Sequence, residues 1–169
     1  DNRGLQTLEQ AITSQPEMYS DWQVSGNDPA ILVYTSGSAG KMKGVVLTHG
    51  NILAQIKLLS DMIPFTTKDS YLCIQPLFYL DYAFYFWLVI ERGGLPLVAE
   101  TFSKQAFWSI VEKYKPTFLN VTPSILNILL TAKENAQGKN TQSLKYISCC
   151  GEILYPETIT AWESNFGGE

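Results

Sequence analysis

The sequence predicts an α/β fold in which a mainly parallel β-sheet is covered by helices on both faces. Two observations lead to this prediction. Short runs rich in β-branched and aromatic residues alternate along the chain with helix-like segments of about ten residues, which is typical of βαβ units. The chain also has 169 residues, 46% of them hydrophobic, which is enough for one domain with a sizeable core.

Residues 1–28 are predicted to form a short helix and a linker. Apolar residues recur at helical spacing over residues 5–12, and Pro16 ends this segment. Between Trp22 and Pro29 the composition shifts to Ser, Gly, Asn, Asp and Pro, which is typical of a linker. Residues 29–169 are therefore expected to make up the main folded part.

The main part is predicted to begin with two strands and a helix. Residues 30–34 form an apolar run typical of a buried strand. A loop follows at residues 35–44, and it holds three glycines, two serines, a threonine and two lysines. Residues 45–47 resume a strand, and residues 51–62 have the apolar spacing of a helix.

The rest of the chain is predicted to alternate between strands and helices. Pro123 suits the first turn of a helix, because the missing N–H has no partner there. The polar stretch 134–143 is predicted to be a surface loop. The predicted strands are residues 71–74, 95–99, 117–121 and 144–149, and the predicted helices are residues 82–91, 104–114, 123–133 and 156–165.

Charge and composition argue against several classes of protein. The chain carries 12 basic and 16 acidic side chains, a formal net charge of −4, and so lacks the cationic excess that nucleic-acid binding requires. The longest apolar run, residues 83–90, is far shorter than the roughly 20 residues of a membrane-spanning helix. Three cysteines without CxxC spacing and a single histidine do not make a zinc site. We therefore expect no metal site and a reducing, cytoplasmic setting.

The loop at residues 35–44 has the composition of a phosphate-binding loop. No Asp or Glu occurs from Pro29 to Ser60, whereas three lysines make this window positive. Glycines expose backbone N–H groups and hydroxyls add donors, which suits a polyphosphate. The loop is not a Walker A motif, which would need Gly in place of Thr35 and Ser or Thr in place of Met42. The alternative interpretation is a solvated Gly/Ser hairpin without a ligand.

Residues 32–51, LVYTSGSAGKMKGVVLTHGN, closely resemble the phosphate-binding signature of the adenylate-forming superfamily, usually written YTSGSTGxPKGVxLTHxN. This superfamily includes acyl- and aryl-CoA synthetases, fatty acyl-AMP ligases and the adenylation domains of nonribosomal peptide synthetases. The resemblance implies that Lys43 is a catalytic residue. Ala39 and Met42 depart from the pattern, and the hydroxyl lost at Ala39 removes one donor. The nucleotide-binding residues implied here are Thr35, Ser36, Gly37, Ser38, Ala39, Gly40 and Lys43.

Later segments resemble the same superfamily in the same order. Residues 75–79, QPLFY, resemble a P-L-F-H segment in which the last position, here Tyr79, gates the acyl pocket. Residues 120–126, NVTPSIL, resemble its TPS-type helix start. Residues 150–156, CGEILYP, resemble the GGExLxP segment, whose backbone borders the adenine. The nucleotide-binding residues that this last segment implies are Gly151, Glu152 and Ile153.

Several single residues have two interpretations. Asp81 coincides with the aspartate that peptide-synthetase adenylation domains use to hold an amino group, which makes Tyr79 and Asp81 candidate substrate-binding residues. The alternative for Asp81 is a helix N-cap. Glu152 is either a nucleotide neighbour or a structural carboxylate. His49 is interpreted as a packing or capping residue, since no nucleophile motif accompanies it. The adjacent Cys149 and Cys150 are expected on opposite faces of a strand.

The resemblance implies a piece of an ATP-dependent ligase that activates a carboxylate as an acyl-AMP and releases pyrophosphate. It implies ATP and Mg²⁺ as cofactors, with a small-molecule carboxylate and the thiol of CoA or of a carrier protein as partners. The superfamily's ribose-binding, magnesium-binding and C-terminal-domain motifs do not occur here. Residues 29–169 are therefore expected to be part of a larger AMP-binding N-terminal domain, inactive in isolation. The alternatives are another phosphate-binding α/β protein, such as a kinase, and a noncatalytic remnant that acts as a binding module.

Overall fold

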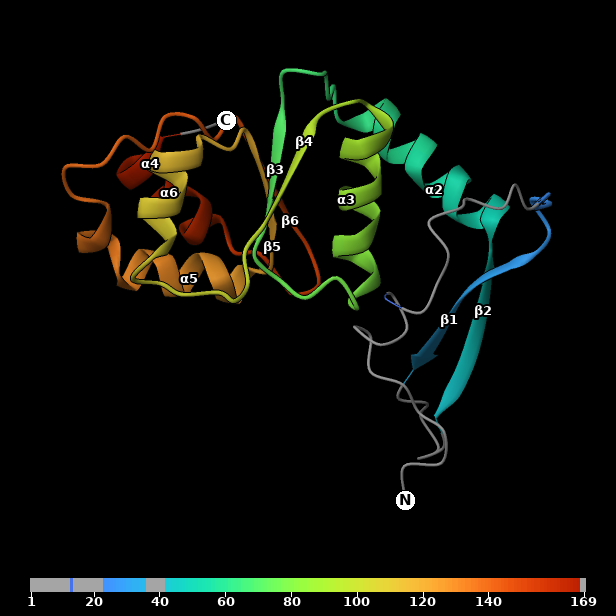
Figure 1. Ribbon diagram of the computed structural model, residues 1–169. Helices are drawn as coiled ribbons and strands as arrows, with labels where there is room; N and C mark the ends of the chain where they lie inside the picture. Colours follow the sequence, from blue (N-terminus) through green and yellow to red (C-terminus); the bar gives the residue numbers. More distant parts are fainter. Residues whose placement is uncertain (1–12, 14–22, 36–41, 168–169) are drawn as a thin grey trace.

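The computed structural model describes Thr13, residues 23–35 and residues 42–167 (Figure 1). The helix predicted over residues 5–12 lies outside these ranges. The described elements are β1 (Pro29–Thr35), β2 (Lys43–Thr48), α2 (His49–Met62), β3 (Ser70–Cys73), α3 (Leu80–Glu91), β4 (Leu95–Val98), α4 (Phe107–Tyr114), β5 (Phe118–Val121), α5 (Pro123–Thr131), the short 3₁₀ helix η1 (Lys133–Ala136), β6 (Tyr146–Cys149) and α6 (Pro156–Phe166).

Four of the strands form one parallel sheet in the order β4-β3-β5-β6. Helix α3 covers one face of this sheet, with α2 beside it, and helices α4, α5 and α6 cover the other (Figure 1). This arrangement confirms the predicted α/β class with helices on both faces. Each crossover between parallel strands contains at least one helix, as the alternating sequence pattern requires.

Alternate residues of the central strands point into two separate cores, because successive side chains of a strand face opposite sides. On the α3 side, the buried strand residues are Tyr71, Cys73 and Phe118. On the other side, Leu72, Leu119 and Val121 pack against α4, α5 and α6. The second core is rich in aromatic contacts, since the ring of the fully buried Trp108 lies 4.3 Å from that of Phe166 and 5.8 Å from that of Trp162.

The first two strands do not join this sheet. β1 and β2 pair with each other as an antiparallel hairpin, which in Figure 1 lies on the far side of α3 from the parallel sheet. The prediction of a buried strand at residues 30–34 is therefore wrong for the described part of the chain, where Leu32 is 53% and Tyr34 59% exposed. Among the described strands, these two form backbone hydrogen bonds only with each other. Their apolar side chains stay exposed because no helix of the described residues covers the hairpin as α3 covers the sheet.

The ends of several helices differ from the predicted ones for local reasons. Helix α2 starts at His49, because the Thr48 side chain accepts the Asn51 N–H at 3.2 Å and the Asn51 side chain accepts the Thr48 N–H at 3.0 Å. This reciprocal capping box leaves the exposed His49 without the predicted capping role. Helix α4 starts at Phe107 rather than residue 104, because the Ser103 hydroxyl oxygen accepts a hydrogen bond from the Ala106 N–H in the turn before the helix.

Candidate functional site

The end of the β1–β2 hairpin brings together two of the predicted nucleotide-binding residues. In the strand register Thr35 lies directly opposite Lys43, and both are exposed. Five other predicted residues of this loop, Ser36, Gly37, Ser38, Ala39 and Gly40, lie outside the described residues. Gly44 follows Lys43, and a Cβ there would lie 3.0 Å from the end of the exposed Leu32 side chain, which would have to shift slightly.

The Lys43 ammonium group is free to meet an anion. With the described residues it forms no ion pair, and the nearest acidic residues in the sequence lie before Pro29 and after Ser60. An exposed cation opposite a threonine hydroxyl suits a phosphate group, since charge-assisted hydrogen bonds fix the oxygen positions. β1 and β3 run in the same direction in the view of Figure 1, so the carboxyl ends of both strands point to the same side of the molecule.

A second group of predicted residues lies in the turn that follows β6, at the carboxyl edge of the parallel sheet. Ligands of open α/β sheets bind at this edge. We call residues 150–153 the β6 turn. Gly151 adopts φ = +87°, a conformation that favours glycine, and Ile153 is 73% exposed. The β6 turn therefore presents backbone and an apolar side chain to solvent.

The Glu152 carboxylate reaches from the β6 turn to the start of helix α5. Its Oε2 accepts the Ser124 hydroxyl at 2.6 Å and the Ser124 backbone N–H at 3.2 Å. Ser124 lies in the first turn of α5, where backbone N–H groups have no partner within the helix. Of the two interpretations for Glu152, these contacts match the structural carboxylate.

Asp81 joins a polar cluster beneath the start of α3. Its Oδ2 accepts the Asn120 side-chain N–H at 2.8 Å and the Cys150 thiol at 2.9 Å. The N-cap interpretation of Asp81 is wrong, because the N-cap residue of α3 is Tyr79 and no side chain caps this helix. The carboxylate instead links α3 to β5 and to the β6 turn.

The two adjacent cysteines lie on opposite faces of the sheet, as predicted. Cys149 packs beside the core of α4, α5 and α6, whereas Cys150 points to Asp81 on the α3 side. Burial, together with the hydrogen bond to Asp81 and its negative charge, raises the pKa of the Cys150 thiol to about 12. The Cys150 thiol is therefore protonated at neutral pH and acts as a donor.

Tyr79 is the N-cap residue of α3 and lies two residues before Asp81 in the sequence. Its ring is 53% exposed, and its centroid lies 4.6 Å from that of Phe78 and 6.3 Å from that of Tyr82. Burial raises the pKa of Tyr82 to about 12, with the Cys150 and Asp81 charges adding to the effect. The exposed rings of Phe78 and Tyr79 form an apolar rim next to an acidic side chain.

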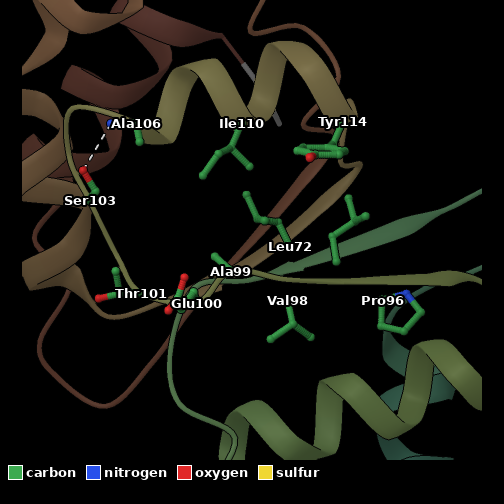
Figure 2. A pocket seen from close by; sticks show the side chains of 11 residues that line it. Leu72, Pro96, Val98, Ala99, Glu100, Thr101, Ser103, Ala106, Ile110 and Tyr114 are labelled. Carbon is green, nitrogen blue, oxygen red and sulfur yellow. Dashed lines mark hydrogen bonds between the residues drawn. The ribbon is translucent and has the colours of Figure 1, made fainter.

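A cavity of about 530 Å³ lies elsewhere, between α4 and the edge strand β4. Figure 2 shows Ile110 and Tyr114 of α4 over Leu72, with Glu100 and Thr101 at one end. The lining is mostly apolar and its charged side chain is a carboxylate, so this cavity does not suit a phosphate group.

The described residues hold neither a cluster of metal ligands nor a membrane-spanning helix. Among them, no three His, Cys, Asp or Glu side chains converge as metal ligands would. Within the same ranges, no helix is both long and apolar enough to cross a bilayer.

Sequence reasoning missed three partners of the predicted residues, namely Asn120, Cys150 and Ser124. The contact of Asn120 could have been predicted, because a polar residue stands within the short apolar strand β5. In the structure this side chain is fully buried. A buried amide needs a hydrogen-bond partner, and the sequence offers a lone acidic residue, Asp81, among the aromatic residues of α3.

The described geometry defines an α/β protein with an exposed lysine at the end of a hairpin, and a comparison with known families shows its class. The residue pattern of the family described as "AMP-binding enzyme" matches residues 3–169, so this chain belongs to the AMP-binding enzyme family. This agrees with the resemblance found in the sequence.

Several similar proteins are CoA ligases. The chain is 29% identical to the probable CoA ligase CCL5 of Humulus lupulus, over 86% of this chain and 27% of that protein. It is 31% identical to the sulfoacetate–CoA ligase of Cupriavidus necator, over 82% of this chain and 27% of that protein. The chain thus spans about a quarter of the length of these relatives.

A solved structure shares the fold. The N-terminal domain of FACL13 from Mycobacterium tuberculosis, with an inhibitor bound, superimposes with a TM-score of 0.83 at 22% identity, over 90% of this chain and 38% of that one. The predicted α/β fold, which this chain shares with that N-terminal domain, is thereby confirmed.

Proposed function

We propose that the whole protein containing this chain is an ATP-dependent ligase that activates a carboxylate. A carboxylate oxygen attacks the α-phosphorus of ATP, the bond to the β-phosphate oxygen breaks, and acyl-AMP and pyrophosphate form. The acyl group is then transferred to the thiol of CoA or of a carrier protein, with release of AMP. The CoA ligases among the relatives support CoA as the acceptor.

The observation that carries this proposal is the exposed Lys43 opposite Thr35 at the end of the hairpin, which forms no ion pair with any residue that the structure describes. We assign Lys43 to the β- and γ-phosphates, where its charge offsets the negative charge of the departing pyrophosphate. Thr35 adds a hydroxyl donor, and we assign the five residues from Ser36 to Gly40 to the same nucleotide, as the resemblance implies. The protein's contribution to this step is positioning and charge neutralisation.

We assign the adenine to the β6 turn and the carboxylate substrate to the rim at Tyr79 and Asp81. The exposed backbone at Gly151 and the exposed Ile153 side chain suit a planar apolar base. The rings at Tyr79 suit the apolar part of a substrate, and acyl, aryl and amino acids all remain open as substrates. We place the Mg²⁺ ligand in another part of the whole protein, and we expect the isolated 169-residue chain to be inactive.

The test is ATP–pyrophosphate exchange by the whole protein carrying Lys43→Ala. We expect the exchange rate to fall about 100-fold, since a preorganised donor to a developing charge is lost. Lys57→Ala is the matched control, because Lys57 is an exposed lysine of α2 in the same acid-free window. Unchanged exchange in Lys43→Ala would contradict the assigned role.

A titration separates the alternative functions. Thermal stabilisation of the whole protein by ATP, AMP and a stable acyl-AMP analogue, but not by GTP, supports the ligase. Equal stabilisation by ATP and GTP supports a generic phosphate loop, and no response to any of them supports a noncatalytic remnant.

A further inference from the structure

We infer that Glu152 is a positioning residue, which shapes the β6 turn through Ser124 and does not itself contact the nucleotide. The inference rests on the proposed function, because it concerns the turn assigned to the adenine. We use the word clamp for the two hydrogen bonds between Glu152 and Ser124, which hold the turn after β6 against the start of α5.

The backbone of the β6 turn needs such a clamp. Gly151 occupies the left-handed region at φ = +87°, and the turn leaves the sheet where the last ladder bond, from the Cys150 N–H to the Val121 carbonyl, measures 3.1 Å. Beyond that bond, the Glu152 side chain is what ties the turn to α5.

The Glu152 carboxylate is well placed for a structural role. Its Oε2 already accepts two donors from Ser124, and the N-terminus of α5 stabilises its negative charge. A carboxylate in contact with a nucleotide would also repel the phosphates, whereas a carboxylate turned toward α5 leaves the Gly151 backbone free to face the base.

The clamp predicts a particular pattern of kinetic constants. In the whole protein, Glu152→Ala should raise the KM for ATP about fivefold, the equivalent of one ordinary hydrogen bond, while kcat and the KM for the carboxylate stay unchanged. Glu152→Gln keeps an acceptor oxygen and should restore most of the wild-type KM. Ser124→Ala should raise the KM for ATP in the same direction, and the double variant should be no worse than Glu152→Ala alone.

Glu157→Ala is the matched control. Glu157 is also an exposed acidic residue in the first turn of a helix, α6, so its removal reproduces the loss of charge without loss of the clamp. Its KM for ATP should equal that of the wild type.

Amide hydrogen exchange gives a readout that does not depend on activity. Exchange at residues 151–154 of the whole protein should become faster in Glu152→Ala and stay unchanged in Glu157→Ala. Unchanged exchange in Glu152→Ala would overturn the clamp.

The kinetic outcomes separate this inference from the proposed function. An active wild type with an unchanged KM for ATP in Glu152→Ala overturns the inference alone. A raised KM in Glu152→Ala with an unaffected Ser124→Ala also overturns it, since this pattern indicates direct contact with the nucleotide. Absence of pyrophosphate exchange in the wild type overturns the proposed function and, with it, the assignment of the turn to the adenine.

Discussion

The β1–β2 hairpin and the β6 turn are built in different ways. The hairpin is a local structure, in which pairing within residues 29–48 brings Thr35 opposite Lys43 and apolar side chains stay exposed. The β6 turn depends on distant contacts, since Cys150 bonds Asp81 and Glu152 bonds Ser124. Under the proposed assignment, a flexible cation is enough to hold a phosphate chain, whereas a planar base needs a backbone that is held from several sides.

The largest difference should be found in how much a core substitution lowers the free energy of unfolding in each region. The parallel sheet that carries the β6 turn has two cores, and the hairpin has none among the described residues. Trp108→Ala should lower the free energy of unfolding of this chain by about 3–5 kcal/mol, since it leaves a cavity between α4 and α6. Leu32→Ala in the hairpin should change it by less than about 0.5 kcal/mol. Urea unfolding measures both, and equal losses would show that the hairpin is as tightly packed as the sheet.

A smaller loss of stability is expected from a substitution in the β6 turn itself. Gly151→Ala should destabilise this chain by about 1–2 kcal/mol, because alanine is strained at φ = +87° even though the nearest side-chain atom, on Thr122, is 3.6 Å from the added Cβ. Gly138→Ala is the control for general strain at positive φ, at +73° in open space outside the site. Both variants should lose similar stability, and only Gly151→Ala should also weaken ATP binding by the whole protein.

The Cys150 thiol provides a chemical test of the contacts around the turn. Because burial and Asp81 raise its pKa to about 12, little thiolate exists at pH 8 and alkylation by iodoacetamide should be slow. Asp81→Asn removes the negative charge that opposes thiolate formation and should speed alkylation of Cys150 about tenfold. Site-resolved mass spectrometry measures this rate. A rate that is equal in both proteins would show that Asp81 and Cys150 are not in contact.

The sequence predicts where strands and helices form better than it predicts which side chains they bury or contact. The four parallel strands and their helices follow from local patterns, whereas most of the loop predicted at residues 35–44 lies outside the described residues. The exposure of β1 could not be predicted. An apolar run such as residues 30–34 indicates that a strand forms, but it does not indicate which other elements cover that strand. The pairs Asp81–Asn120 and Glu152–Ser124 join residues 39 and 28 positions apart, and no local pattern encodes such contacts.

The most direct test of the account is calorimetric binding of ATP and of a stable acyl-AMP analogue to the whole protein carrying Lys43→Ala. If the hairpin holds the β- and γ-phosphates and the β6 turn holds the base, the variant should bind ATP about tenfold more weakly and the analogue, which lacks those phosphates, as tightly as the wild type. Equal weakening of both ligands, or of neither, would contradict the division of the nucleotide between these two regions.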